Sequence, residues 1–328
     1  MPEQAPWKFQ KIIKPLFDPS AQHTVLTGRV LSCRGNEVIE DGFVELADGK
    51  ITAVGAAAEL GSRRAAAVVT AGTILPGLFN NHAHLGWDGI HDLANQSIND
   101  APEISAYKCA GNMRVSLRAG VTTVRDLGMN NSNLFAKQAV AQGIFPGPRL
   151  LVCGQAIIQT AGHTYWCCRE ASGPDEMRRA VREQVRAGVD LIKITGSHDR
   201  VEMTDEELAA CVDEAHRNGL PVTAHATFDE VINRVVRFGT DAGSLVVGHG
   251  VIVPEMKFMI QIGLCADTYD AIHSATTISA SLNKLADKVG TLEAGKLADL
   301  IVVEGNPLQD IEALAKVKMT FVDGKRLV

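Results

Sequence analysis

The sequence predicts a mixed α/β protein, in which a larger α/β part is joined to a small β-domain. Three observations predict it: strands alternate with helices along the middle of the chain, short strands with tight turns lie at both ends, and polar residues follow several middle strands. Alternating strands and helices are typical of parallel sheets, whereas short strands joined by tight turns indicate antiparallel pairing. An α/β barrel and a doubly wound sheet both fit the middle.

The bulk composition excludes several classes of protein. The formal net charge is −6 over 328 residues, and no run of Lys and Arg suggests a nucleic-acid partner. No apolar stretch reaches the roughly 18 residues that a membrane helix needs, and the first 20 residues lack the apolar core of a signal peptide. The seven cysteines are scattered without CxxC spacing, which indicates reduced, buried thiols. We therefore expect a cytoplasmic protein without a membrane partner.

Short apolar strands occupy both ends of the chain. They are expected at residues 24–31, 42–46, 50–54, 299–303 and 319–322. Asp48-Gly49 and Asp323-Gly324 are typical of two-residue hairpin turns. Because two β-rich ends flank a different middle, we expect one β-domain built from residues 1–72 and 288–328. Residues 73–287 then form the α/β domain.

The middle of the chain alternates strands and helices. Its strands are apolar on both faces, as a buried parallel sheet requires, and are expected at residues 73–78, 121–124, 149–152, 189–194 and 221–226. One helix is expected to begin at Pro174 and to end at Gly188. Another begins with a capping box, Thr204 with Glu207, and ends at Asn218-Gly219.

Two histidines at the end of the first of these strands carry the strongest chemical signal. His82 and His84 are spaced i, i+2, so in a strand both side chains point to one face. Two converging imidazoles form half of a divalent-metal site. The alternative is a pair of hydrogen-bonded polar residues where a strand meets a loop.

Later strands carry further candidate residues, at the carboxyl ends where α/β barrels place their function. Lys193 lies within a buried strand, where an amine is costly. It is either a structural ion pair or a neutral amine that carries CO₂ as a carbamate. His225 ends the next strand and Asp241 ends a later one. Each alone is a core histidine or a turn residue, and only their joint occurrence favours a metal site.

These segments resemble the amidohydrolase superfamily of metal-dependent (β/α)₈ hydrolases, and within it the imidazolonepropionase-like and Xaa-Pro dipeptidase-like group. The matching segments are residues 76–85, 120–126, 191–193, 224–226, 239–243 and 290–300. The resemblance implies that His82, His84 and Asp241 hold one divalent ion. It also implies that carboxylated Lys193 bridges to a second ion, which His225 partly holds. Zn²⁺ is the expected cofactor, with one or two ions and other divalent metals left open.

The resemblance also implies a reaction, the hydrolysis of an amide- or peptide-type C–N bond in a small-molecule substrate such as a dipeptide or N-acyl amino acid. Two ions that share a water lower its pKa and polarise the scissile carbonyl, and Asp241 would be the general base. His163 matches a loop of the family and is expected to contact the substrate. A plain surface histidine is the alternative there.

The sequence departs from the family pattern between His225 and Asp241. The family has a further metal-binding histidine on strand 6 and then a seventh strand, but only about fifteen residues separate the two positions here. A βα unit needs roughly 30 residues. We therefore expect an incomplete TIM barrel of about six strands, with units 6 and 7 lost, beside a β-sandwich built from both termini. Unpaired strand edges favour association, so a homo-oligomer is expected.

His249 has two interpretations. Residues 244–250 could form a strand that ends in His249 and supplies the missing ligand. We prefer the register in which residues 254–263 and 268–283 are the closing helices of the family, which places His249 after the last strand and nearer substrate than metal. The departure leaves two functions open beside the metal-dependent hydrolase. These are a catalytically impaired deletion form that binds a partner, and a small-molecule binding protein.

Overall fold

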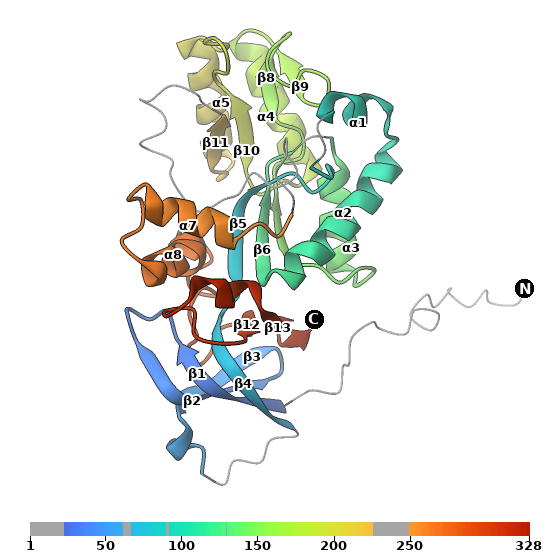
Figure 1. Cartoon of the computed structure of the whole chain (residues 1–328). Helices are drawn as coiled ribbons and strands as arrows, with labels where there is room; N and C mark the ends of the chain where they lie inside the picture. The colour runs from blue at the N-terminus through green and yellow to red at the C-terminus, as the bar shows by residue number, and fades with distance from the viewer. Residues whose placement is uncertain (1–22, 62–66, 90–91, 129, 226–248) are drawn as a thin grey trace, which may run out of the picture.

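The computed structural model describes residues 23–61, 67–89, 92–128, 130–225 and 249–328. Strands from both ends of the chain gather at one side, and the parallel strands with their helices lie at the other (Figure 1). No described helix combines the length and the apolar character that a membrane crossing needs. All seven cysteines are free thiols and six are buried, as predicted. Burial raises the pKa of Cys33 and Cys211 to about 12.

One seven-stranded sheet joins the two ends of the chain. Its strand order is β14-β13-β12-β4-β1-β2-β3. The strands are β1 (His23–Leu31), β2 (Val38–Ala47), β3 (Lys50–Ala56), β4 (Ala67–Pro76), β12 (Leu300–Val303), β13 (Val317–Val322) and β14 (Lys325–Arg326). The antiparallel pair of β4 and β12 connects the N-terminal strands to the C-terminal ones. The described strands here form a single sheet, so the expected sandwich stays a prediction.

Two tight turns in this sheet have the backbone that their sequences predict. Asp48 and Gly49 have φ of 50° and 79°, and Asp323 and Gly324 have φ of 48° and 71°. Positive φ at both central residues is the conformation of the type I′ hairpin turn, which Asp-Gly adopts readily. Both hairpins are therefore confirmed.

The chain passes from the terminal sheet to the parallel strands at Gly77. The apolar run at 73–78 predicted one strand, but β4 ends at Pro76 and β5 (Leu78–Ala83) begins at Leu78. A Cβ atom at Gly77 would lie 2.0 Å from Thr122 Oγ1, so only glycine fits where β4 gives way to β5. The prediction was wrong here because an apolar run does not reveal that its halves belong to two sheets.

The parallel strands form two groups, in the orders β5-β6-β7 and β11-β10-β8-β9. Their bounds are β6 (Val121–Asp126), β7 (Arg149–Val152), β8 (Ile157–Gln159), β9 (Arg169–Ala171), β10 (Ile192–Thr195) and β11 (Val222–His225). Asp190 joins the groups, because its N–H donates to the Val152 carbonyl at 2.8 Å and its carboxylate accepts from the Val152 N–H at 2.8 Å. The described strands thus form an open, barrel-like arrangement, and the number of barrel strands stays a prediction.

The helices cover the outside of these strands. They are α1 (Leu93–Asn99), α2 (Pro102–Arg118), α3 (Ser132–Ala141), α4 (Pro174–Ala187) and α5 (Asp205–Arg217). As predicted, α4 begins at Pro174 and is terminated by Gly188, its C-cap, whose φ is 86°. The predicted capping box of α5 is also present, with Thr204 and Glu207 each accepting from the other's backbone N–H.

The closing helices pack against β5. They are α7 (Val253–Gln261), α8 (Thr268–His273) and α9 (Ser279–Leu282), with a π-helical turn at Ser274–Ile278. Asn81 on β5 donates to Ser279 Oγ at 2.7 Å and accepts from Asn283 Nδ2 at 2.7 Å. In Figure 1, α7 and α8 lie beside β5. These bonds fix the position of the strand that carries His82.

Candidate metal and substrate pocket

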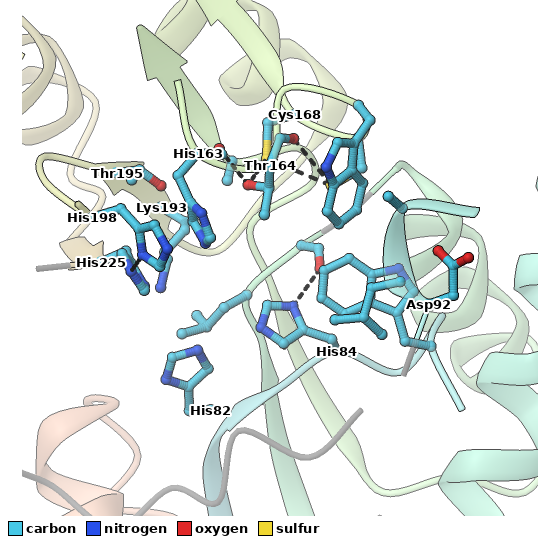
Figure 2. Close-up of a pocket in the computed structure, with 18 residues that line it drawn as sticks. His82, His84, Asp92, His163, Thr164, Cys168, Lys193, Thr195, His198 and His225 are labelled. Carbon is cyan, nitrogen blue, oxygen red and sulfur yellow. Dashed lines mark hydrogen bonds between the residues drawn. The ribbon is translucent and has the colours of Figure 1, made fainter. Parts of the chain in front are cut away.

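A cavity of about 470 Å³ opens at the carboxyl ends of the parallel strands. Five residues that the sequence singled out line it: His82, His84, His163, Lys193 and His225. They come from β5, from the loop after β8 and from β10 and β11, far apart in the sequence. Figure 2 shows their side chains around one space. The structure therefore brings these five predicted residues together.

A backbone carbonyl sets the tautomer of His84. The Nδ1 atom of His84 lies 2.7 Å from the Gly128 carbonyl oxygen. A carbonyl oxygen only accepts, so Nδ1 carries a proton, and in the neutral ring the lone pair is on Nε2. A histidine whose second nitrogen is held in this way is prepared to bind a metal ion through the other.

A buried carboxylate positions both partners of that contact. Asp126, at the end of β6, accepts from the Leu85 N–H at 2.6 Å, the Gly128 N–H at 2.9 Å and Asn133 Nδ2 at 2.8 Å. Leu85 follows His84 in the chain, and Gly128 carries the carbonyl to which His84 donates. Asp126 thus fixes the His84 ring through two loops. In the sequence, Asp126 stood out only as the last residue of the matching segment 120–126.

Lys193 faces the cavity from the middle of the second group of strands. It lies on β10, has 5% of its surface exposed, and pairs with Thr223 of β11, two residues before His225. The buried position matches the sequence expectation, and its carboxylation stays a prediction.

Three imidazoles gather beside Lys193. The donor nitrogens of His163, His198 and His225 lie within 4.8 Å of one another, and His198 Nδ1 is 3.1 Å from His225 Nε2. All three rings are half-buried. Sequence reasoning missed His198, although the rule that found the others would have found it: it follows β10 at the same carboxyl edge.

The donor set fits a divalent first-row ion. Imidazole nitrogen is a common ligand of Zn²⁺, Co²⁺, Ni²⁺ and Cu²⁺, and at least three converging ligands make a structured site. The cluster of His163, His198 and His225 supplies that number, and His84 is held in the tautomer that binds metal. Asp241, the predicted ligand and general base, lies outside the described residues.

His249 lies next to the pocket wall. Its Nε2 is 3.0 Å from the Trp87 carbonyl oxygen and therefore donates to it. Burial lowers the pKa of His249, so the folded protein favours the neutral ring. Trp87 itself lines the cavity. The structure thus links His249 to the pocket through Trp87, and the predicted substrate contact stays a prediction.

Part of the cavity wall is apolar. Trp87 and Trp166 line it with ring centroids 5.8 Å apart, and Leu93 lies beside them. Trp87 also lies against the His84 ring, at 4.7 Å, and its indole N–H donates to Ser97 Oγ at 2.9 Å. The cavity therefore has an imidazole side and an aromatic side, which suits a substrate with a polar reacting bond and an apolar group.

Adjacent cysteines complete this wall. Cys167 and Cys168 have sulfur atoms 3.8 Å apart, and both line the cavity. The hydrogen bond between the thiols lowers the pKa of Cys168, and together with burial it raises the pKa of Cys167. Their adjacent positions differ from the CxxC spacing of metal and redox sites.

Parallel strands with a polar pocket at their carboxyl ends are the arrangement in which α/β-barrel enzymes place their active sites. Comparison with known families makes the class specific, because the profile of the amidohydrolase family matches residues 73–235 and 228–327. The chain belongs to the amidohydrolase family, whose members are hydrolytic enzymes that act on C–N bonds.

Relatives of known identity agree with this assignment. The ochratoxinase of Aspergillus niger is 26% identical over 329 aligned positions, which cover 84% of this chain and 68% of that protein. The crystal structure of a Xaa-Pro dipeptidase with bound methionine superposes with a TM-score of 0.83 at 23% identity, covering 93% of this chain and 99% of that one. The structure of the Aspergillus niger ochratoxinase gives a TM-score of 0.79 at 23% identity, covering 93% and 95%. These structural likenesses establish the fold.

The sequence matches also bear on the expected internal loss. The alignment has 329 positions but includes only 84% of this 328-residue chain. Some of its positions are therefore residues of the ochratoxinase that have no counterpart here. The family profile also matches in two pieces that meet at residues 228–235. Both features are consistent with a shortened barrel, and which βα units are missing stays a prediction.

Proposed function

We propose that this protein is a metal-dependent hydrolase of amide-type C–N bonds in small substrates that carry an apolar or aromatic group. The observation that carries the proposal is the convergence of histidines and Lys193 on one pocket at the carboxyl ends of the parallel strands. Membership of the amidohydrolase family gives this pocket its reaction class.

The proposed site divides the work among this chain's own residues. His82, His84, Lys193 and His225 are proposed to hold divalent metal, with Zn²⁺ as the expected ion and Asp241 as a further ligand. A bound divalent ion lowers the pKa of water and polarises a carbonyl oxygen. Asp241 is proposed to act as general base, taking a proton from the attacking water and delivering it to the leaving nitrogen. Asp126, through Leu85 and Gly128, keeps His84 aimed at the pocket.

The aromatic wall gives the proposed substrate its second feature. Trp87 and Trp166 offer two ring faces within the cavity, and Leu93 extends the apolar surface. A substrate group that packs there leaves water out and holds the scissile bond near the imidazoles. N-acyl amino acids and dipeptides with an aromatic side chain have the required combination of an amide and an apolar group.

The metal and the base are tested together. Purified protein is analysed for bound metal and assayed on N-acyl amino acids and dipeptides, before and after chelation. We expect chelation to abolish turnover and Zn²⁺ to restore it. The Asp241→Asn variant should keep its metal while turnover falls by about 10²–10⁴-fold, the usual contribution of a general base. Undiminished hydrolysis by metal-free protein would contradict the proposal, and folded, metal-loaded protein without any turnover would favour the non-enzymatic alternative.

Substrate packing on the aromatic wall is tested at Trp166, with the neighbouring Tyr165 as the matched control. Trp166 lines the cavity, whereas Tyr165 is 59% exposed and does not. We expect Trp166→Ala to lower kcat/KM about tenfold for aromatic substrates, equivalent to about 1.4 kcal/mol of lost contact. Tyr165→Ala should leave it unchanged. Equal effects of the two variants would argue against substrate packing on this wall.

A further inference from the structure

We propose that His163, His198 and His225 form a divalent-metal site of their own, made of three imidazoles, with His198 as an essential ligand. The site is distinct from the pair His82 and His84, which come from β5 and its end. It extends the proposed function, which already assigns metal to His225, by adding His163 and His198 as ligands, and ion binding at these rings is measurable without any substrate.

The first argument is the spacing of the donor atoms. Two nitrogen ligands at about 2.0–2.1 Å from one tetrahedral ion are about 3.4 Å apart. His198 Nδ1 and His225 Nε2 share a hydrogen bond of 3.1 Å, close to that separation, so an ion bound by both nitrogens would replace the shared proton; the third nitrogen lies within 4.8 Å. In the part of the chain that the structure describes, no other three His, Cys, Asp or Glu side chains converge this closely.

The second argument is that the loops are tied to one another by their backbones. The His163 N–H donates to the Glu202 carboxylate, at 3.0 and 3.1 Å from its two oxygens. The Glu202 N–H donates to the Gly196 carbonyl at 3.0 Å, and the Gly196 N–H donates to the His225 carbonyl at 3.1 Å. Each of the three loops is therefore bonded to the next. The imidazoles are held near one another before any ion binds, which lowers the cost of assembling a site.

A short hairpin presents His198 between the other two rings. Ser197 and Val201 form an antiparallel bridge, and the His198 N–H donates to the Arg200 carbonyl at 3.0 Å. The His198 ring then stacks on His163 and lies near His225, with centroid distances of 3.7 and 5.2 Å. Figure 2 shows His198 between these rings, on the opposite side of the space from His84.

Ring orientation predicts an order among the three ligands. His198 and His225 already bring two nitrogens together, whereas the His163 ring lies nearly parallel to His198, at 21°. To share an ion, His163 must turn its ring, for which the adjoining cavity gives room. We therefore expect the loss of His198 or His225 to weaken ion binding more than the loss of His163. The proposed site therefore makes His163 a metal ligand, whereas its loop was expected to place it in contact with the substrate.

The donor chemistry predicts which ions bind. Three imidazole ligands favour Zn²⁺, Co²⁺, Ni²⁺ and Cu²⁺, whereas Mg²⁺ and Ca²⁺ prefer oxygen ligands. Co²⁺ is a suitable probe for Zn²⁺ sites, because its visible absorption reports the ligand geometry. Mg²⁺ at the same concentration should not compete.

The experiment measures metal binding to the full-length chain. Apo-protein is titrated with Zn²⁺ by calorimetry and with Co²⁺ by visible absorption, with bound metal counted after dialysis. The variants are His198→Ala, His198→Asn, His225→Ala and His163→Ala. The matched control is His216→Ala, because His216 is exposed on α5. Circular dichroism and thermal melts of each variant establish folding, and His198→Asn serves if the alanine variant does not fold.

We expect both His198 variants and His225→Ala to weaken one class of Zn²⁺ site by at least about tenfold, since even the loss of a group that only orients a ligand costs that much. His163→Ala should have a smaller effect and His216→Ala none. A His82→Ala, His84→Ala double variant should retain this class of site. Folded His198 variants with wild-type affinity and stoichiometry would overturn the proposal, as would loss of all binding in the double variant. Absent turnover with intact binding would refute only the proposed catalysis.

Discussion

The terminal sheet and the pocket end of the parallel strands are held together by different forces. In the sheet, Leu26, Val44 and Leu300 are fully buried and pack in one apolar cluster. At the pocket end, buried Asp126 and Glu202 accept hydrogen bonds from the backbone of the loops that carry histidines. Apolar packing has no direction, whereas hydrogen bonds fix angles. The comparison teaches that stability and the geometry of the site can be altered separately.

The largest expected effect comes from the apolar cluster. Leu26→Ala removes a fully buried side chain from β1 and should lower the free energy of unfolding by about 2–5 kcal/mol. Urea denaturation measures this change, with Val68→Ala, at 62% exposure, as the control. The metal content of the folded variant should equal that of the wild type. Loss of metal from folded Leu26→Ala protein would break the separation between the two regions.

A second variant alters the pocket end. In Asp126→Asn, an amide NH₂ replaces one acceptor oxygen and faces a backbone N–H. We expect a loss of about 1–3 kcal/mol in the free energy of unfolding, the cost of a buried donor without its acceptor.

The same change should weaken the ion site at His84 by about 10–100-fold, because Asp126 orients that ring through Leu85 and Gly128. Denaturation and Zn²⁺ titration test both effects, with exposed Asp287→Asn as the control. Wild-type Zn²⁺ affinity in Asp126→Asn would show that the carboxylate only stabilises the fold.

The smallest expected effect is a pH dependence of the stability that His249 contributes. Only the protonation of one ring changes, and its packing is kept. Burial lowers the pKa of His249 in the folded protein, while the unfolded ring has the ordinary value of about 6.5. The unfolded state therefore binds the proton first. The stability contributed by the neutral ring is complete above about pH 6.5 and is lost as the pH falls through the lowered pKa of the folded state.

Thermal melts between pH 7.5 and 5 (about the range in which histidine titrates) test this prediction. The melting temperature of the wild type should fall more steeply than that of His249→Gln, which can still donate to the Trp87 carbonyl. Exposed His216→Gln should follow the wild type. Identical curves for wild type and His249→Gln would show that this ring does not contribute to the acid sensitivity.

Local signals predicted much of the fold. The hairpin turns at Asp48-Gly49 and Asp323-Gly324, the capping box at Thr204, and the start of α4 at Pro174 are all present, because each depends on a few adjacent residues. The strands β8 and β9 were not predicted, since three residues are too few for a period to show. Gly77 was also missed, because its need for glycine comes from Thr122 on another strand.

The same limit separates the predicted from the missed residues of the site. His82 and His84 were found because alternation along one strand brings them together, and five predicted residues line the pocket. His198 was missed although it follows β10 at the same carboxyl edge; its contact with His225, which is 27 residues away, depends on the pairing of β10 with β11. Trp87 and Trp166 likewise meet only through the loops that carry them.

By itself, the sequence determined most of the segments that become strands and helices. It also determined that imidazoles follow the strands of a parallel sheet and that an amine lies within one of them. Periodicity, turns and caps are local, so they can be seen in the order of residues alone. Only the tertiary structure decided which nitrogen of His84 carries a proton, which carboxylates hold the loops, and that His198 joins His163 and His225. Those facts depend on distances between residues far apart in the chain, which packing sets and no local pattern encodes.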